Sequence, residues 1–430
     1  MPQEMTLAEA AATLRPVDSV GLPLGTGQPV GFVHALGERD DWERLDVVGA
    51  MLVDFYSLFD HPGVHLASMF FGPAERIYRS AGRNVSYVPC DFRRFATVMQ
   101  RLSPRVVATM ATEPDRDGWM SLSLHAGAST DELSRAAADP DRVLLVEASS
   151  AFPRTFGLSE RDHRIHVDEV DILCHSATVP VELVEPPVGA VETAIADHAI
   201  GFIDDGATLQ TGFGAIPSTI ASVLARGDGG DYGVHSEMFT TGLMRLHRAG
   251  KVTNARKTQF SGYSLATFAA GVTELYSWLD HNPDVRFAPV SLVNDPTNIA
   301  NNHRMVSING AISIDLWGQV AADSIIGHQF SGVGGHEDFV AGTGLELEDR
   351  SLICLPSTAT IDGVTVSRIL TTMPEGAIVS TPRHQVDVVI TEFGAARLRG
   401  RTTEERARAL VEIAHPDFRD ELTANLGRFR

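Results

Sequence analysis

Short apolar runs alternate with longer helical patterns along the first part of the chain. Four of these runs are apolar and β-branched enough for buried strands, namely DVVGAMLV (46–53), VHLASMFF (64–71), RVVATMAT (105–112) and RVLLVEAS (142–149). Polar, alanine-rich stretches such as residues 129–142 lie between them and have helical character. Continuous apolar strands separated by helices predict a largely parallel sheet that helices cover on both faces.

The pattern is interrupted near residue 185 and then begins again. Two consecutive prolines, Pro186 and Pro187, break both helix and strand and form a semi-rigid connector. The length of 430 residues also exceeds that of one typical domain. We therefore expect two α/β domains of the same general class, an N-terminal one at 1–185 and a C-terminal one at 186–430, with a ligand-binding cleft between them.

The second half repeats the alternation of helices and strands. Helical patterns lie at 191–203 and 216–226, and a last one at 402–414 opens with Thr402 and Glu405 at the spacing of a capping box. The strand candidates are ATLQTG, SLATFAAG, VRFAPVSLVND, MVSINGAISID, SLICLPST and DVVITEFG. No short-period repeat or low-complexity tract is found in the sequence.

Charge and composition narrow the function classes. The formal net charge is −20, with 55 acidic and 35 basic residues, so the surface repels nucleic acid and anionic membranes. An anionic small ligand then needs locally concentrated donors. The only lysines, Lys251 and Lys257, both lie in the segment KVTNARK. Arginine-rich codon usage explains most of this scarcity, and the clustering is a mild sign of local selection.

Cysteine usage and the apolar pattern predict a soluble cytoplasmic protein. Cys90, Cys174 and Cys354 are far apart in the sequence and form neither a disulfide framework nor a zinc ribbon. The sequence has no basic start followed by an apolar run, as a signal peptide would have. No stretch approaches the roughly 20 apolar residues that cross a bilayer.

The strongest local signal for chemistry is DYGVHSEMFTTG, residues 231–242. YGVHS is predicted to be a short strand and TTGLMRLHRAG the helix that follows it. Glu237 then lies where a strand ends and the chain turns, the edge at which α/β proteins commonly place ligand groups. A carboxylate there suits a general base, a metal ligand or a nucleophile. A helix-start acid that favours the positive end of the helix dipole explains it equally well.

Two glycine-rich segments are further candidates for a ligand site. TGFGAIP (211–217) lies between a strand and a helix, where glycines let backbone N–H groups approach an anion. Pro217 replaces the third glycine of a dinucleotide fingerprint, so a tight turn explains this segment alone. FSGVGGHEDF (330–339) is able to present amides to an oxyanion or to form a surface turn.

Other chemistries find little support. The histidines and acids of DHRIHVDEVD alternate with period two, so a half-exposed strand is favoured over a metal site. The absence of HExxH, P-loop and GxSxG motifs argues against zinc peptidases, nucleotide hydrolases and serine hydrolases. We predict no metal.

Taken together, these segments resemble the acetyl-CoA hydrolase/transferase family, which includes 4-hydroxybutyrate and butyryl-CoA:acetate CoA-transferases. The likeness is strongest from about residue 190 to residue 420. It rests on these motifs in the family's order: GFGAIP, GVHSEMFTTG, VTNARK, PVSLVNDPTNIANN, MVSINGAISIDLWGQVAADS, SGVGGHEDF, LPST, VVITEFG and IAHPDFR. GRNVSYVPC, EPDRDGWMSLS and AFPRTFG extend it more loosely into the first domain.

The resemblance implies particular site residues. It implies that Glu237, in HSEM, is the nucleophile that forms a glutamyl-CoA thioester. The implied coenzyme A-binding residues are Gly212, Phe213, Gly214, Ala215, Ile216, Ile312 and Gly335. It further implies that the substrates are an acyl-CoA and a small carboxylic acid, with no cofactor beyond coenzyme A as co-substrate, and that the protein is a homo-oligomer.

Three other functions stay open at this point. An acyl-CoA hydrolase would use the same residues, and only the dependence of its rate on a carboxylate acceptor separates it from a transferase. A catalytically silent coenzyme A-binding protein is disfavoured by the intact Glu237, and a nicotinamide dehydrogenase by Pro217. The sequence departs from the family pattern at Thr240, Thr241 and His336, which puts the choice of acyl donor and acceptor in doubt.

Overall fold

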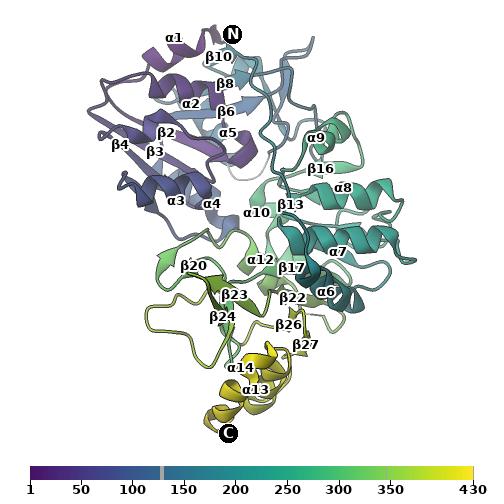
Figure 1. The fold of residues 1–430 in the computed structure, drawn as a ribbon. Helices are drawn as coiled ribbons and strands as arrows, with labels where there is room; N and C mark the ends of the chain where they lie inside the picture. Colours follow the sequence, from purple (N-terminus) through teal and green to yellow (C-terminus); the bar gives the residue numbers. More distant parts are fainter. Residues whose placement is uncertain (126–129, 345, 430) are drawn as a thin grey trace. The chain divides into compact units, whose positions relative to one another are not determined.

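The structure is a computed structural model that describes residues 1–125, 130–344 and 346–429. The chain forms two compact units, each built around a mainly parallel β-sheet (Figure 1). The first unit comprises residues 1–183 and 265–293, and the second comprises residues 184–264 and 294–430.

The first unit contains an eight-stranded sheet in which every pair of neighbours is parallel. Its strand order is β1-β10-β8-β6-β2-β3-β4-β5. These strands are β1 (Gln3–Glu4), β2 (Val17–Leu24), β3 (Arg44–Ala50), β4 (Val64–Ser68), β5 (Val85–Tyr87), β6 (Val106–Ala111), β8 (Val143–Ala148) and β10 (Ile172–His175). The parallel α/β class expected from the apolar runs is confirmed, and β2 is a central strand that those runs did not include.

Helices cover both faces of this sheet, which explains why its strands are apolar on both sides. The helices are α1 (Leu7–Ala12), α2 (Val30–Gly37), α3 (Pro73–Ser80), α4 (Phe95–Leu102) and α5 (Thr130–Ala138). In β8, Leu145 packs in the cluster of α1 and α2, whereas Leu144 and Val146 pack in the cluster of α5. Alternate residues of one strand therefore serve two separate cores.

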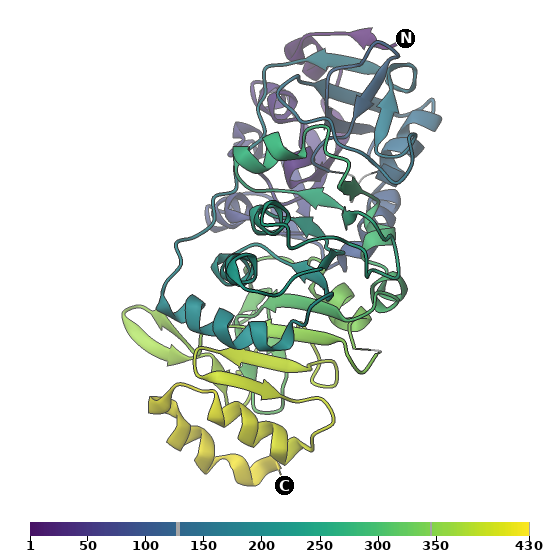
Figure 2. The ribbon, with the colours of Figure 1, turned by 90° about the vertical axis from the view of Figure 1, so that its right-hand side faces the viewer.

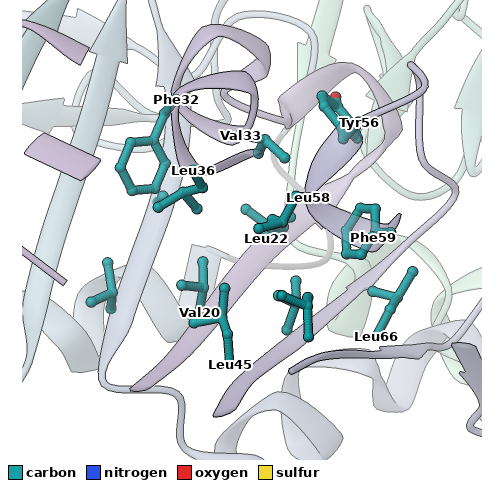
Figure 3. Close-up of a cluster of buried hydrophobic side chains, with 14 of the residues drawn as sticks. Val20, Leu22, Phe32, Val33, Leu36, Leu45, Tyr56, Leu58, Phe59 and Leu66 are labelled. Carbon is teal, nitrogen blue, oxygen red and sulfur yellow. The ribbon is translucent and has the colours of Figure 1, made fainter. Parts of the chain in front are cut away.

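The larger core lies between α2 and the central strands. Figure 3 shows Phe32, Val33 and Leu36 of α2 facing Val20 and Leu22 of β2, and all five side chains are buried. Burying a side chain of this size stabilises a fold by roughly 1.5–3 kcal/mol, so this layer fixes α2 on the sheet.

Residues 265–293 return to the first unit through main-chain hydrogen bonds. The amides of Ala269, His281 and Phe287 donate to the carbonyls of Leu124, Arg154 and Phe156, at 2.7, 2.8 and 2.8 Å. This segment begins within β14 (Ser264–Ala266) and contains β15 (Phe268–Ala269), α9 (Thr273–Leu279), β16 (Val285–Phe287) and α10 (Val290–Val293). The predicted domains had assigned it to the C-terminal half, because such long-range pairing leaves no local pattern.

One predicted strand is partly wrong. The run VRFAPVSLVND was expected to form a single strand, but β16 ends at Phe287 and α10 begins at Val290. Pro289 lacks an amide donor for a ladder and fits the first turn of a helix. Its carbonyl accepts the amide of Val293 at 3.0 Å.

The second unit is built on a six-stranded sheet with the order β12-β11-β17-β22-β26-β27. All neighbours are parallel except the last pair. The strands are β11 (Thr208–Thr211), β12 (Gly233–Val234), β17 (Met305–Gly310), β22 (Arg350–Cys354), β26 (Val388–Thr391) and β27 (Gly394–Arg397). Since five strands run the same way, their carboxyl ends meet at one edge.

The helices of the second unit follow these strands. They are α6 (Ala190–Ala199), α7 (Ala215–Arg226), α8 (Thr241–Arg248), α11 (Pro296–Ala300), α12 (His336–Gly342), α13 (Thr403–Glu412) and α14 (Pro416–Ala424). Figure 2 shows α13 and α14 side by side next to β26 and β27. Thr402 caps α13, and its predicted capping box with Glu405 is confirmed.

Short strands complete the two units. The first unit has an antiparallel pair of β7 (Trp119–Ser121) and β9 (Arg164–His166). The short strands of the second unit are β13 (Met238–Phe239), β18 (Ser313–Asp315), β19 (Val320–Ala321), β20 (Ser324–Ile325), β21 (His328–Gln329), β23 (Thr358–Ile361), β24 (Val364–Ser367) and β25 (Ile369–Leu370). Over the described residues, the helices are too short or too polar to span a bilayer.

Candidate active site

Glu237 lies at the carboxyl edge of the second sheet, directly after its outermost strand. β12 ends at Val234, and Ser236 ties the turn that follows to the neighbouring strand β11. The Ser236 hydroxyl accepts the amide of Thr211 at 3.3 Å and is 3.2 Å from the Thr211 carbonyl. It also contacts the Met238 carbonyl at 2.8 Å. These contacts fix the main chain on both sides of Glu237.

The Glu237 carboxyl contacts two residues from distant parts of the sequence. Asn294 donates from Nδ2 to Oε2 of Glu237 at 2.7 Å. The main chain of Gly335 lies so close that an added Cβ would stand 1.9 Å from the same oxygen. The φ of Gly335 is −88°, which suits any residue. Glycine is therefore required at position 335 by the close approach of the Glu237 carboxyl and not by the backbone conformation. The Glu237 side chain stays partly exposed.

The protonation of Glu237 is strongly perturbed. Burial raises the pKa of its carboxyl to about 8, the hydrogen bond from Asn294 opposes this rise, and the charge of Asp338 adds to it. Asp338 is fully buried on α12 and accepts Nδ2 of Asn294 at 3.0 Å. Asn294 thus bridges two carboxyl groups. A carboxyl with a raised pKa at the edge of a sheet is a frequent feature of functional sites.

Two buried histidines flank this group. His235 is fully buried, contacts Nδ2 of Asn302 through Nδ1 at 3.2 Å and packs against Phe339 with ring centroids 6.3 Å apart. His336 contacts the hydroxyl of Thr381 through Nε2 at 2.8 Å. Burial lowers the pKa of His336 to about 4, so its ring is neutral at pH 7.

A glycine-lined cavity of about 260 Å³ opens along the same sheet edge. The loop after β11 forms one side of it, and the ends of β17 and β22 form another, through Ile308–Ala311 and Cys354. Gly214 has a φ of +135°, which favours glycine, and α7 begins at the next residue, with Ala215 and Ile216 lining the cavity. Because β11 is paired with both β12 and β17, the cavity and Glu237 lie at the ends of adjacent strands.

Comparison with known proteins identifies the family. The family model "Acetyl-CoA hydrolase/transferase C-terminal domain" matches residues 271–426. The 4-hydroxybutyrate coenzyme A transferase of Clostridium kluyveri is 36% identical over 97% of this chain and 96% of its own length. The succinyl-CoA:cyclohexane-1-carboxylate CoA transferase of Geobacter metallireducens is 34% identical over 96% of this chain and 93% of its own length. The chain belongs to the acetyl-CoA hydrolase/transferase family.

The fold agrees with that assignment. The crystal structure of RipA from Yersinia pestis, 32% identical, superposes with a TM-score of 0.89 over 99% of this chain and 97% of that one. The resemblance to the acetyl-CoA hydrolase/transferase family inferred from the ordered motifs is therefore confirmed, as is the α/β fold that it implied.

Most of the coenzyme A-binding residues expected from the acetyl-CoA hydrolase/transferase family gather at this edge of the sheet. The five loop residues line the cavity; they are Gly212, Phe213, Gly214, Ala215 and Ile216. Gly335 contacts Glu237 instead, and Ile312 follows the cavity wall, with its amide bonded to the Ala321 carbonyl at 2.9 Å. Their role in binding coenzyme A stays a prediction.

The departures from the family pattern have structural explanations. The Thr240 hydroxyl caps α8 by accepting the amide of Leu243 at 3.3 Å, and Thr241 is buried in the first turn. His336 occupies the first turn of α12 next to Gly335. The threonines therefore stabilise the start of α8, which begins four residues after Glu237.

Sequence reasoning missed the two residues that set the state of Glu237. Asn294 was present in the motif PVSLVNDPTNIANN and Asp338 in SGVGGHEDF, but neither was singled out. Asn294 is 57 residues from Glu237 in the sequence, and Asp338 is 44 residues from Asn294. The available signal was the presence of both residues inside motifs that carry the family resemblance.

Proposed function

We propose that this protein transfers coenzyme A between a short-chain acyl-CoA and a carboxylic acid, with Glu237 as the covalent nucleophile. The observation that carries the proposal is a partly exposed carboxyl of raised pKa between the amide of Asn294 and the backbone of Gly335. The full-length similarity to proteins named CoA transferases supports the same reaction class.

The first half-reaction uses two nucleophiles in turn. The ionised carboxylate of Glu237 attacks the carbonyl carbon of the thioester, the C–S bond breaks, and coenzyme A leaves as a thiolate. The thiolate then attacks the glutamyl carbonyl of the resulting anhydride. The C–O bond to the donor breaks, the donor acid leaves as its carboxylate, and a glutamyl-CoA thioester remains.

The second half-reaction reverses these steps with the acceptor carboxylate. No proton is consumed over the cycle, and the thioester is exchanged rather than hydrolysed. Each addition places negative charge on an oxygen next to Glu237, where the Nδ2 donor of Asn294 lies. A preorganised donor of this kind contributes roughly 3–4 kcal/mol in other acyl-transfer enzymes. Carboxylates, a thiolate and the coenzyme suffice, so the proposal requires no metal or redox cofactor.

Trapping the covalent intermediate tests the proposal. The protein is incubated with acetyl-CoA or butyryl-CoA, reduced with borohydride and mapped by peptide mass spectrometry. We expect the mass of a carboxyl converted to an alcohol at Glu237, dependent on acyl-CoA and prevented by excess acceptor acid. The Glu237→Gln variant is the control. An unmodified Glu237 with every acyl-CoA tried would refute the covalent role.

Acceptor dependence separates transfer from hydrolysis, which would use the same glutamate. For a transferase, loss of acyl-CoA rises with the concentration of the carboxylic acid, and free coenzyme A does not accumulate. If free coenzyme A is released at the same rate without any acceptor, water is the acceptor and the protein is an acyl-CoA hydrolase.

A further inference from the structure

Arg368 is a cation that lines the glycine-rich cavity. Its backbone is fixed, because its amide donates to the Ser357 carbonyl at 2.8 Å and its carbonyl accepts the Ile314 amide at 2.9 Å. Among the described residues, its guanidinium forms neither a hydrogen bond nor an ion pair. Burial accordingly lowers the pKa of Arg368, although the group keeps its charge at neutral pH.

The acid whose charge acts on Arg368 does not form an ion pair with it. Glu392 acts on Arg368 only through its charge at a distance. Both of its carboxylate oxygens are bound by Ser357, one by the amide at 2.8 Å and the other by the hydroxyl at 2.6 Å. A half-buried arginine held in place without a counter-ion is costly, and an anionic ligand would offset that cost.

Asn309 is a second polar residue that lines the same cavity. Its side chain is 8% exposed, and among the described residues its Nδ2 has no hydrogen-bond partner. A buried amide donor left unsatisfied calls for an explanation such as a missing ligand. Asn309 lies in β17 and Arg368 lies between β24 and β25, so the two observations come from different parts of the chain.

Backbone amides add a third group of donors. α7 has 12 residues, begins at Ala215, and has neither a side-chain cap at Gly214 nor an acidic residue in its first turn. Ala215 and Ile216 of its first turn line the cavity, so the positive end of its dipole lies there, whereas Pro217 has no N–H to contribute. Glu192 also lines the cavity, where its Oε2 accepts the Gly189 amide at 2.9 Å. It suits a hydroxyl or amide N–H of the same ligand.

We propose that this cavity binds a phosphate group of coenzyme A, with Arg368 as its counter-ion and Asn309 and the first amides of α7 as neutral donors. This inference rests on the proposed function and adds a specificity-determining residue to it. The volume of about 260 Å³ holds one part of the coenzyme rather than the whole molecule. Planar arginine suits bidentate binding of phosphate oxygens better than lysine does.

The test uses a series of acyl thioesters with progressively fewer phosphates: acyl-CoA, acyl-dephospho-CoA, acyl-4′-phosphopantetheine and acyl-pantetheine. For Arg368→Met we expect KM for acyl-CoA to rise by about tenfold to a hundredfold, because a charge-assisted bond is lost. Its kcat/KM for acyl-pantetheine, which has no phosphate, should stay within about twofold of the wild type. Arg368→Lys should recover part of the loss.

Two further variants control for structural damage. Asn309→Asp keeps the shape of the side chain and puts a carboxylate in the cavity. It should therefore also raise KM for acyl-CoA and leave kcat/KM for acyl-pantetheine unchanged. Arg401→Met removes an exposed arginine outside the cavity and should match the wild type with all four substrates. If the wild type and Arg368→Met differ with acyl-CoA but not with acyl-dephospho-CoA, the cavity binds the 3′-phosphate. If the difference persists with acyl-4′-phosphopantetheine, the phosphate next to pantetheine is bound.

Equal losses of Arg368→Met with acyl-CoA and acyl-pantetheine, or no loss with either, would overturn the inference. Calorimetric titration with free coenzyme A separates this failure from failure of the proposed function, because it needs no turnover. A protein without transferase activity would still bind coenzyme A more weakly after the Arg368→Met change if the inference is right. Equal affinities of the wild type and this variant would reject it.

Discussion

At Glu237, burial and hydrogen bonding act on one carboxyl in opposite directions. Desolvation and the charge of Asp338 favour the protonated form, and the Nδ2 donor of Asn294 favours the ionised form. The balance leaves a pKa of about 8, so most molecules hold the proton at pH 7 in the ligand-free state. A carboxylate of higher pKa is also a stronger nucleophile, which suits attack on a thioester.

The pH dependence of the first half-reaction follows from this pKa. We expect kcat/KM for acyl-CoA to rise by about tenfold per pH unit below pH 8 and to level off above it, because only the ionised carboxylate attacks. Steady-state rates between pH 6 and 9.5 measure the profile. A flat profile over this range would contradict the assignment.

The neighbours of Glu237 should shift that profile in opposite directions. Asn294→Ala removes the bond that lowers the pKa, so the rise should move to higher pH. Asp338→Asn removes the charge that raises the pKa, so the rise should move to lower pH. Shifts of both variants in the same direction would mean that the profile reports another group.

The contact of Gly335 with Glu237 gives a steric prediction. In Gly335→Ala, the new Cβ would collide with Oε2, and the flexible glutamate side chain would rotate away from Asn294. We expect kcat to fall by about a hundredfold with little change in the melting temperature, since displacement by about 1 Å costs that much in other enzymes. Gly201→Ala, where a Cβ meets nothing within 4 Å, is the matched control. Full activity of Gly335→Ala would show that this approach is unimportant.

At the scale of elements, the segment that holds both lysines supports the strand before Glu237. β12 is an edge strand, and the chain at 251–257 covers its free side. The amide of Val234 donates to Oδ1 of Asn254 at 2.9 Å, and its carbonyl accepts Nζ of Lys257 at 2.8 Å. Lys257 also donates to the Tyr263 carbonyl at 2.9 Å. The clustering of lysines thus has a local structural cause.

Lys257→Met should lower stability by an amount that depends on pH. Burial lowers the pKa of Lys257 to about 7 in the folded state, against 10.5 for an unperturbed lysine. Between these values the unfolded chain binds more protons, so the wild type gains stability as pH rises, by at most about 1.4 kcal/mol per pH unit. The variant lacks this gain, and the difference between the two proteins should widen from pH 7 to pH 10.

Denaturant unfolding of both proteins at several pH values measures that difference. Lys251→Met, which removes the other lysine, controls for the loss of one positive charge. A difference that stays constant or shrinks with rising pH would contradict the buried state of the Lys257 amine.

The same scale shows what the sequence could predict. Apolar runs and glycine breaks located most strands and helices, and strand-end positions singled out Glu237 and the loop at 212–216. Asn294, Asp338 and Arg368 escaped notice, because their importance comes from contacts made by elements distant in the sequence. The position of 265–293 was missed for the same reason. Local pattern predicts an element and its end, whereas only the packed sheet determines which ends meet.

For the whole molecule, the net charge of −20 opposes the binding of an anionic coenzyme. The second unit offsets this repulsion with donors gathered in one place. One edge of its parallel sheet gathers glycine-loop amides, Asn309 and Arg368 next to the turn that carries Glu237. Neutral backbone donors supply much of this binding capacity, and they do so without adding further charge. The partly buried carboxyl of Glu237 at the same edge then lowers the stability of the fold at high pH.

That cost predicts a stability gain on removing the Glu237 carboxyl. The folded-state pKa of Glu237, about 8, exceeds the ordinary value of 4.5, so the folded protein holds the proton and loses stability as pH rises from 4.5 to 8. Glu237→Gln resembles the protonated form and lacks this loss. Its melting temperature should match the wild type near pH 4.5 and exceed it at pH 8.5, by about 2–4 °C for each kcal/mol of stability that the wild type loses. Calorimetric melts of both proteins across this range decide the matter, with Gly201→Ala as a variant that should track the wild type. A difference in melting temperature between Glu237→Gln and the wild type that is the same at all pH values would show that the Glu237 carboxyl is already ionised in the folded protein. That result would refute the proposed protonation of the resting site.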